Sequence, residues 1–590
     1  MRAAALLCLA VGALSLAGSA AAIDSIGDRR PAKAVQAAAP ARTPFLRRTP
    51  GFGRGPGSQA SSHGPGQTVP GWSSRVGQGK AAPSAAPSTT SAPGGGPEPA
   101  GLRNRTAGAH SGKAAGLGFG RGPAARAALP GKSAGPHSSP TSFNRIGTMA
   151  RPGQRPSRPI VADFASRQIE HRQAIAALRN RLPARPLPGE RGFTGVPPAG
   201  ESRFVTDEMV FHVGPNVSRE AAESALRRLG LTTVGAQRSS LIGGTMLRLR
   251  IGDGRPVADV VRALEAENIG IAQPDYVFTL QQDSSLAART VGGDGGQYVV
   301  KKLHLGEIHR VATGSNVLVA VIDSAIDAGH PDLAGAVVDE LDAVGRPDRP
   351  HLHGTGMAGA IAARHRLLGI APAARILAVH AFSPGARETA QATTRHIIAG
   401  LEWAIGKGAH VINMSFAGPY DPMLALAMKN AREKGVVLVA AAGNMGPDSP
   451  PLYPAADPNV IAVTATDESD RIFAKANQGP HIAVAAPGVN IIEPAPNAGY
   501  QVTTGTSVAA AHVSGVAALM LERDPSLDPA ALHEILTISA WKLGSQGHDD
   551  RYGWGLVDPG RALQYLDVRI ADRKPAPAPT AAAPGALSSR

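Results

Sequence analysis

The chain contains one cysteine, Cys8, among 590 residues. It lies near the start, where Met1 and Arg2 precede an apolar stretch, residues 3–17, and three alanines, residues 20–22. This order is typical of an export signal cleaved after Ala22, because the stretch is too short to span a bilayer comfortably; a retained anchor is the alternative. The remaining chain has no cysteine, which excludes disulfides and cysteine-liganded metal sites. We therefore expect an exported protein, periplasmic or extracellular, with a signal peptide over residues 1–22.

Acidic and large apolar residues are scarce from residue 23 to residue 200. This region has 25 Lys and Arg against six Asp and Glu, and is otherwise rich in Pro, Gly, Ala and Ser. Such a composition buries too little apolar surface to fold, so the sequence predicts a disordered basic region. One helical pattern, residues 161–181, predicts a short isolated helix within it.

The basic residues of this region bear on possible partners. The whole chain carries a net charge of +15, less than this region alone, so the rest of the protein is mildly acidic. Nucleic-acid binding is therefore a poor explanation of the charge. An anionic envelope surface is a more plausible partner for the tail, and an inert spacer is the alternative.

Residues 201–282 show periodic patterns of apolar residues, which predict a small α+β unit. Strands are expected over residues 204–213, 245–251 and 269–280, and helices over residues 218–229 and 256–267. Residues 283–297 follow as a linker with the glycine-rich segment 292–296.

Residues 298–566 alternate between strand and helix patterns, which predicts an α/β domain with a mostly parallel sheet and helices on both faces. Residues 567–590, rich in Ala and Pro, predict a disordered tail. The expected strands cover residues 317–322, 376–382, 411–415, 436–442 and 460–466, and the expected helices begin near residues 353, 393, 423 and 507.

Three polar residues stand at the edges of apolar elements in this domain. Asp323 ends an aliphatic strand, His353 opens a helix of small residues, and Ser507 begins a long apolar helix. A helix start presents free N–H groups that favour developing negative charge, although Gly-Thr-Ser at a helix start is also an ordinary cap. Together the three residues fit acyl transfer, in which Ser507 attacks, His353 moves the proton and Asp323 orients the ring.

Asn444 supplies a fourth candidate group. It follows the aliphatic strand 436–442 and Gly443, where its amide could donate to an oxyanion. The alternative is a turn-forming Gly-Asn pair after a strand. The presence of the other three residues favours the oxyanion role.

The segments around these residues resemble those of the subtilisin-like serine proteases. The resemblance covers residues 298–566 and rests on Asp323-Ser324, His353-Gly354-Thr355, Gly505-Thr506-Ser507 and Asn444. One departure is Ala325, where the family usually has glycine; a positive φ there would strain an alanine. In this family two segments flank the first specificity pocket, and here they correspond to Ser415, Phe416, Ala417 and Gly418 and to Ala441, Ala442 and Gly443.

The resemblance also implies a precursor. The unit over residues 201–282 stands where the family has a ferredoxin-like propeptide, which assists folding and then occupies the cleft with its C-terminal segment. Self-processing would then fall within residues 283–297. The implied partners are peptide or protein substrates and the chain's own propeptide, and we expect a monomer. A catalytically impaired envelope-binding protein with the same fold, damaged by Ala325, is the alternative function.

Other interpretations of the same residues are poorer, and the sequence indicates no cofactor. The segment 499–507 lacks the lysine of a phosphate-binding loop, since Thr506 stands at that position. His351 and His353 could bind metal, but no suitably spaced acidic or cysteine ligands accompany them. The acidic turn 467–470 could bind calcium, yet it lacks the alternation of a dedicated calcium loop, so a solvated turn is expected.

Overall fold

The computed structural model describes residues 160–179, 181, 185–214, 216–280, 296–385 and 389–573. All of these belong to one compact unit, residues 134–590. The expected signal peptide, residues 23–159 of the basic region, residues 283–295 of the linker and residues 574–590 of the tail lie outside the described residues. Within the described ranges, no helix combines the length and apolar character that crossing a membrane requires.

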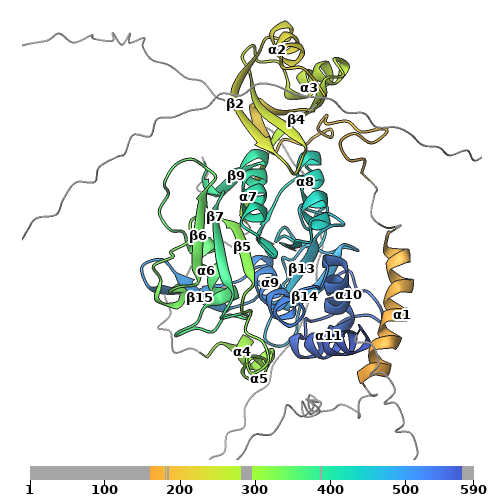
Figure 1. The fold of residues 1–590 in the computed structure, drawn as a ribbon, viewed down its shortest axis with the longest axis vertical. Coiled ribbons are helices and arrows are strands. Elements are labelled where there is room, and N and C mark those ends of the chain that lie inside the picture. The colour runs from red at the N-terminus through yellow and green to blue at the C-terminus, as the bar shows by residue number, and fades with distance from the viewer. Residues whose placement is uncertain are drawn as a thin grey trace, which may run out of the picture. The chain divides into compact units, whose positions relative to one another are not determined.

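A seven-stranded sheet forms the centre of the larger domain (Figure 1), and every neighbouring pair in it is parallel. The strand order is β14-β13-β12-β10-β5-β7-β6. This confirms the α/β prediction. The strands are β5 (Leu318–Asp323), β6 (Val337–Asp342), β7 (Arg375–His380), β10 (Val411–Met414), β12 (Val437–Ala441), β13 (Ile461–Thr466) and β14 (Ile482–Pro487).

Helices cover both faces of this sheet because the central strands are apolar on both sides. Along β5, Val319 and Val321 join one core with helices α6 (Leu352–Ala362) and α9 (Thr506–Arg523). Ala320 and Ile322 join the other core with α7 (Thr394–Gly406) and α8 (Pro422–Glu433).

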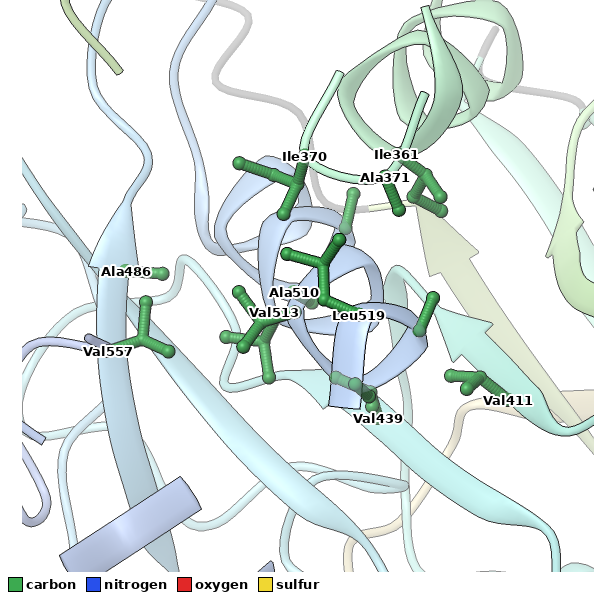
Figure 2. Close-up of a cluster of buried hydrophobic side chains, with 14 of the residues drawn as sticks. Ile361, Ile370, Ala371, Val411, Val439, Ala486, Ala510, Val513, Leu519 and Val557 are labelled. Atoms are coloured by element: carbon green, nitrogen blue, oxygen red, sulfur yellow. The ribbon is translucent and has the colours of Figure 1, made fainter. Parts of the chain in front are cut away.

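The first core centres on α9, the helix that begins at Thr506. Figure 2 shows its residues Ala510, Val513 and Leu519 among apolar side chains of the neighbouring segments. Helices α10 (Pro529–Ser539) and α11 (Pro559–Arg573) join the same core. The start of α9 is therefore held in a fixed position. Smaller elements are α4 (Tyr298–Lys302), α5 (Leu305–Ile308), a 3-10 turn (Pro331–Leu333), β8 (Ser383–Pro384), β9 (Ala390–Thr393), β11 (Phe416–Ala417), β15 (Ile491–Ala495) and β16 (Gly499–Thr503).

The preceding unit is an antiparallel sheet of order β2-β3-β1-β4 with two helices, in the β-α-β-β-α-β order of a ferredoxin-like unit, which the family resemblance implied. Its own core includes Met209, Phe211, Leu249, Val260 and Leu264. The prediction omitted β2, whose residues alternate weakly between buried and exposed. The elements are β1 (Phe204–Val213), α2 (Arg219–Arg228), β2 (Leu231–Ser239), β3 (Gly244–Ile251), α3 (Val257–Ala266) and β4 (Gly270–Leu280). We call this unit, residues 204–280, the N-terminal domain.

Strand β4 also joins the larger domain. It pairs antiparallel with β9 through Val277, Phe278 and Thr279, and with β11 through Thr279 and Leu280. The end of the N-terminal domain therefore lies as a strand between β9 and β11 of the larger domain.

The helix expected over residues 161–181 is present as α1 (Ile160–Arg179). It is not isolated, contrary to the prediction. Phe164 is 7% exposed and lies in the core of the larger domain, with its ring 5.0 Å from that of Tyr565 on α11. The sequence could not reveal this contact, because the partner surface is formed by helices about 370 to 400 residues further on.

Candidate active site

Asp323 and His353 form a close, buried pair. Asp323 ends β5 and His353 lies in the first turn of α6. Nδ1 of the ring lies 2.8 and 2.9 Å from the two carboxylate oxygens of Asp323. Nδ1–H therefore donates to the carboxylate, which leaves Nε2 as the basic nitrogen. Burial by itself would lower the pKa of His353, but the charge and hydrogen bond of Asp323 outweigh it and raise that pKa above its usual value.

Ser324 fixes the carboxylate and the start of α6 together. Its backbone N–H donates to Oδ1 of Asp323 at 2.7 Å, and its hydroxyl accepts from the N–H of Gly354 at 3.1 Å. Gly354 is required there, since a Cβ would lie 2.3 Å from the carbonyl oxygen of Ser324. The Asp-Ser and His-Gly pairs singled out in the sequence are thus joined by direct contacts.

Ala325, the departure from the family pattern, causes no backbone strain. It is not among the non-glycine residues with a positive φ. Its carbonyl accepts from the N–H of His351 at 2.8 Å. The proposed damage from a methyl group at this position therefore has no support in the backbone.

Ser507 lies in the first turn of α9, and Ser415 at the end of β10 holds it on two sides. The hydroxyl of Ser507 donates to the carbonyl of Ser415 at 3.2 Å, and the hydroxyl of Ser415 donates to the carbonyl of Ser507 at 2.9 Å. Asn413 and Ser514 extend this buried chain, because Asn413 donates to Ser415 and accepts from Ser514. The backbone of Ser507 is fixed by polar groups that are themselves satisfied.

Asn444 is oriented by Thr506, the residue before Ser507. Its Oδ1 accepts from the backbone N–H of Thr506 at 3.1 Å and from its hydroxyl at 2.9 Å. With Oδ1 engaged, Nδ2 is the end of the amide that can donate. Gly443 has φ +109°, and a Cβ there would lie 2.8 Å from Leu452, so the turn needs glycine.

The sheet order explains how these groups meet. β12, β10 and β5 are neighbours, and Asn444, Ser415 and Asp323 stand at or just after their carboxyl ends. Helices α6 and α9 pack against each other, and each carries its candidate residue in its first turn. The four candidate residues are thus brought to one edge of the sheet, where parallel α/β folds commonly bind ligands.

The candidate substrate segments lie beside this edge. Phe416 and Ala417 form β11, which pairs with the end of β4. A Cβ on Gly418 would lie 2.4 Å from the ring of Phe278, so β4 packs directly on this segment. Ala441, Ala442 and Gly443 are buried at the end of β12.

Glu493 on β15 is a residue that the sequence did not single out. It is 1% exposed, and its Oε2 lies 2.6 Å from where a Cβ on Gly356 would stand, one helical turn after His353. Neither carboxyl oxygen has a hydrogen-bond partner among the described residues. Burial raises the pKa of Glu493 to about 7, against the nearby Thr503 hydroxyl and the His353 charge. No motif marks this position, so only the packing of β15 on α6 reveals it.

The contact between β4 and the larger domain buries two more carboxyl groups. Asp421 accepts from Gln273 at 2.7 Å and from Thr394 at 2.6 Å. Asp275 is 1% exposed, has no hydrogen-bond partner in the described part of the chain, and lies 4.0 Å from Nε of Arg395. Burial raises the pKa of Asp275 to about 7, against the nearby charge of Arg395.

The candidate metal ligands have other partners. His353 is engaged by Asp323, and Nδ1 of His351 accepts from the backbone N–H of His353 at 3.2 Å. In the acidic turn, Asp467 accepts from Arg471 and Asp470 pairs with Lys302. Over the ranges that the structure describes, no three His, Cys, Asp or Glu residues gather as a metal site would require.

Comparisons with known proteins agree with this geometry. Residues 314–555 match the model of the subtilase family. The chain is 39% identical to subtilisin E of Bacillus subtilis (strain 168) over 262 residues, which covers 43% of this chain and 67% of that protein. It is 38% identical to the subtilisin of Bacillus pumilus over 262 residues, with 43% and 92% covered.

A third relative is similar over a longer region. Fervidolysin of Fervidobacterium pennivorans is 35% identical over 288 residues, 43% of this chain, and the match spans 41% of fervidolysin's own length. The crystal structure of fervidolysin, described as a keratinolytic enzyme related to subtilisin, superposes with a TM-score of 0.53 at 25% identity. That superposition covers 65% of this chain and 64% of fervidolysin, so it extends beyond the residues of the family match.

Proposed function

This chain belongs to the subtilase family of serine peptidases, and on that basis we propose that it is an endopeptidase acting through Ser507, His353 and Asp323. The observation that supports these roles most is the pair of contacts, 2.8 and 2.9 Å, between Nδ1 of His353 and the carboxylate of Asp323. They orient Nε2 as the base that a serine nucleophile needs.

In the proposed reaction, the hydroxyl oxygen of Ser507 attacks the carbonyl carbon of the scissile peptide bond while Nε2 of His353 accepts its proton. The oxyanion that forms is stabilised by Nδ2 of Asn444 and by N–H groups at the start of α9. His353 then passes the proton to the leaving nitrogen and the C–N bond breaks. Water, deprotonated by the same ring, hydrolyses the acyl-enzyme and releases the acid.

This mechanism predicts a pH dependence. The ring must be neutral to accept the proton, and Asp323 raises the pKa of His353. Turnover should therefore rise as pH rises through that pKa, at a higher pH than for an isolated histidine.

We further infer that the N-terminal domain is an inhibitory propeptide. β4 pairs with β11, the edge to which a substrate backbone would add as a strand. While this pairing lasts, that edge is occupied. Cleavage within residues 283–297 followed by release of β4 would open it.

Export and the remaining partners are also proposals. The order of basic, apolar and small residues over residues 1–22 supports export to the periplasm or medium. The 25 basic residues within residues 23–200 support attraction to an anionic envelope surface.

The proposed function is tested by expressing the chain and a Ser507→Ala variant and following both processing and hydrolysis of a denatured protein substrate. The wild type should be cut between the N-terminal domain and the catalytic residues and should cleave the substrate, while Ser507→Ala stays full length and inactive. Ser469→Ala, an exposed serine in the acidic turn, is the matched control and should behave as the wild type. Normal maturation of Ser507→Ala would contradict self-processing, and substrate cleavage by that variant would contradict the role of Ser507.

A further inference from the structure

The helix α1 is attached to the larger domain by apolar and polar contacts along its length. At its N-terminal end Phe164 is buried against Tyr565, and the Tyr565 hydroxyl donates to the carboxylate of Asp163. Val161 and Ile169, on the same helix, are 57% and 60% exposed. The contact is therefore one-sided and centred on Phe164.

The middle of α1 contacts the end of α10. Nη1 of Arg167 donates to the carbonyls of Ile538 and Ala540 at 3.2 and 3.5 Å, groups that the end of a helix leaves without an internal donor. His171 is buried, with Nε2 2.9 Å from the hydroxyl of Thr537 and its ring 4.5 Å from that of Trp554. These are specific contacts to main-chain and side-chain groups of the larger domain.

The chain after α1 continues along the larger domain before it enters the N-terminal domain. Arg181 pairs with Asp550 at 2.5 Å, and the Arg185 guanidinium lies 4.7 Å from the ring centre of Tyr420. Gly195 then donates to Glu265 on α3 at 2.6 Å. Fifteen residues, 180–194, thus separate the end of α1 from the contact of Gly195 with the N-terminal domain.

The N-terminal region therefore contacts the larger domain in two main areas. Helix α1 packs on α10 and α11, and the N-terminal domain contacts it through β4 on β9 and β11 and through Ser239 and Ser240, which bind Glu402 on α7. Both attachments are N-terminal to residues 283–297, where the proposed function places the cut. A cut there would leave them on one fragment and the catalytic residues on the other. Two linked contacts dissociate far more slowly than one, because each holds the other at a high effective concentration.

We propose that α1 is a second anchor that keeps the cleaved N-terminal fragment bound to the catalytic domain. This rests on the proposed cleavage between β4 and α4 and adds what happens after it. β4 can leave the substrate edge while α1 stays attached, so inhibition is reversible but not lost by dilution. The basic residues before α1 then remain with the processed enzyme.

The test uses the full chain with Ser507→Ala, so that no self-cleavage occurs, and with a recognition sequence for a specific endoprotease inserted between β4 and α4. After cutting, the two fragments are diluted and their dissociation is followed by size-exclusion chromatography over time. Phe164→Ala should speed dissociation at least about tenfold, because it removes the buried centre of one of two linked contacts. Ile169→Ala, at an exposed position of the same helix, should leave it unchanged.

A second variant keeps the test valid if Phe164→Ala does not fold. Arg167→Ala removes the donor to the carbonyls of Ile538 and Ala540 and a partly exposed pair with Asp163 within α1, and it should give a smaller acceleration in the same direction. Dissociation as slow in Phe164→Ala and Arg167→Ala as in the parent would overturn the proposal, since the contacts of the N-terminal domain would then hold the fragment without α1. Because the cut is made by an added protease, this result is independent of whether Ser507 processes the chain.

Discussion

Asp323 in the candidate active site and Asp275 on β4 are both almost fully buried, yet their oxygens have different partners. Asp323 receives hydrogen bonds from the ring of His353 and from the N–H and hydroxyl of Ser324. Asp275 has no hydrogen-bond partner in the described part of the chain and faces Arg395 only at 4.0 Å. A buried carboxylate is stable as a charge only when donors replace its lost water.

Buried aspartates thus have two different roles in this protein. The donors around Asp323 suit a fixed negative charge that orients His353. Burial raises the pKa of Asp275 to about 7, so the charge state of its carboxyl group changes near neutral pH. Asp323 therefore has the donors that a buried carboxylate needs, whereas the charge of Asp275 in the contact between the domains can vary.

The largest effect is expected from replacing each aspartate by asparagine and comparing the turnover of the two variants. Asp323→Asn keeps the size of the side chain but removes the charge that orients and stabilises His353, so turnover should fall roughly 10⁴-fold. Asp275→Asn should leave turnover unchanged once the cleaved N-terminal fragment has been removed, because Asp275 belongs to that fragment. Both variants carry the inserted cleavage site, are cut by the added endoprotease and are freed of the N-terminal fragment before steady-state kinetics are measured. Equal losses of turnover in the two variants would contradict the distinction.

The contact around Asp275 should weaken as pH rises. Its carboxyl has an ordinary pKa of 3.8 when exposed and about 7 in the contact, so protonated Asp275 favours the attached state. Attachment of β4 is thus strongest below about pH 4 and is lost progressively as pH rises towards 7, by at most about tenfold per pH unit. Asp421, whose pKa burial also raises, acts in the same direction, while Arg395 and Arg248 oppose it.

Fragment dissociation measured at pH 5 and pH 8, with Ser507→Ala and the inserted cleavage site, tests this dependence. The parent should dissociate at least about tenfold faster at pH 8, and Asp275→Asn should flatten most of the difference. A parent that dissociates equally fast at both values, or faster at pH 5, would contradict the assignment.

The smallest effect is expected at Glu493. Like Asp275, it is buried and has no hydrogen-bond partner among the described residues, but like Asp323 it lies beside the active-site helix α6. Its charge favours protonated His353, so Glu493→Gln should lower the pKa of His353 and move the pH–rate profile a few tenths of a unit towards acid. Turnover at high pH should hardly change. Glu468→Gln, an exposed carboxylate, is the control, and a profile moved towards alkali would refute this role.

The sequence predicted the features that depend on local pattern. Asp323 was singled out because it ends a continuous apolar run typical of a buried parallel strand, and His353 and Ser507 because each stands at the start of an apolar helix. The other strands of the N-terminal domain were predicted from the sequence, but β2 was missed because its residues alternate only weakly between buried and exposed positions.

The features that depend on distant packing could not be predicted. Phe164 shows no special spacing, and its partner Tyr565 lies some 400 residues later. Glu493 reaches the active-site helix only because β15 packs on α6 beside Gly356. The unpaired state of Asp275 likewise depends on which side chains of α7 and α8 face β4, and no local pattern encodes that.

Labelling with a fluorophosphonate, which reacts only with an activated serine, tests the proposed catalytic centre most directly. The wild type, incubated at pH 8 after its N-terminal region has been removed, should carry one label on the peptide that contains Ser507. The label should be absent from Ser507→Ala and strongly reduced in His353→Ala. Labelling elsewhere, or equal labelling of Ser507 with and without His353, would contradict the proposed triad.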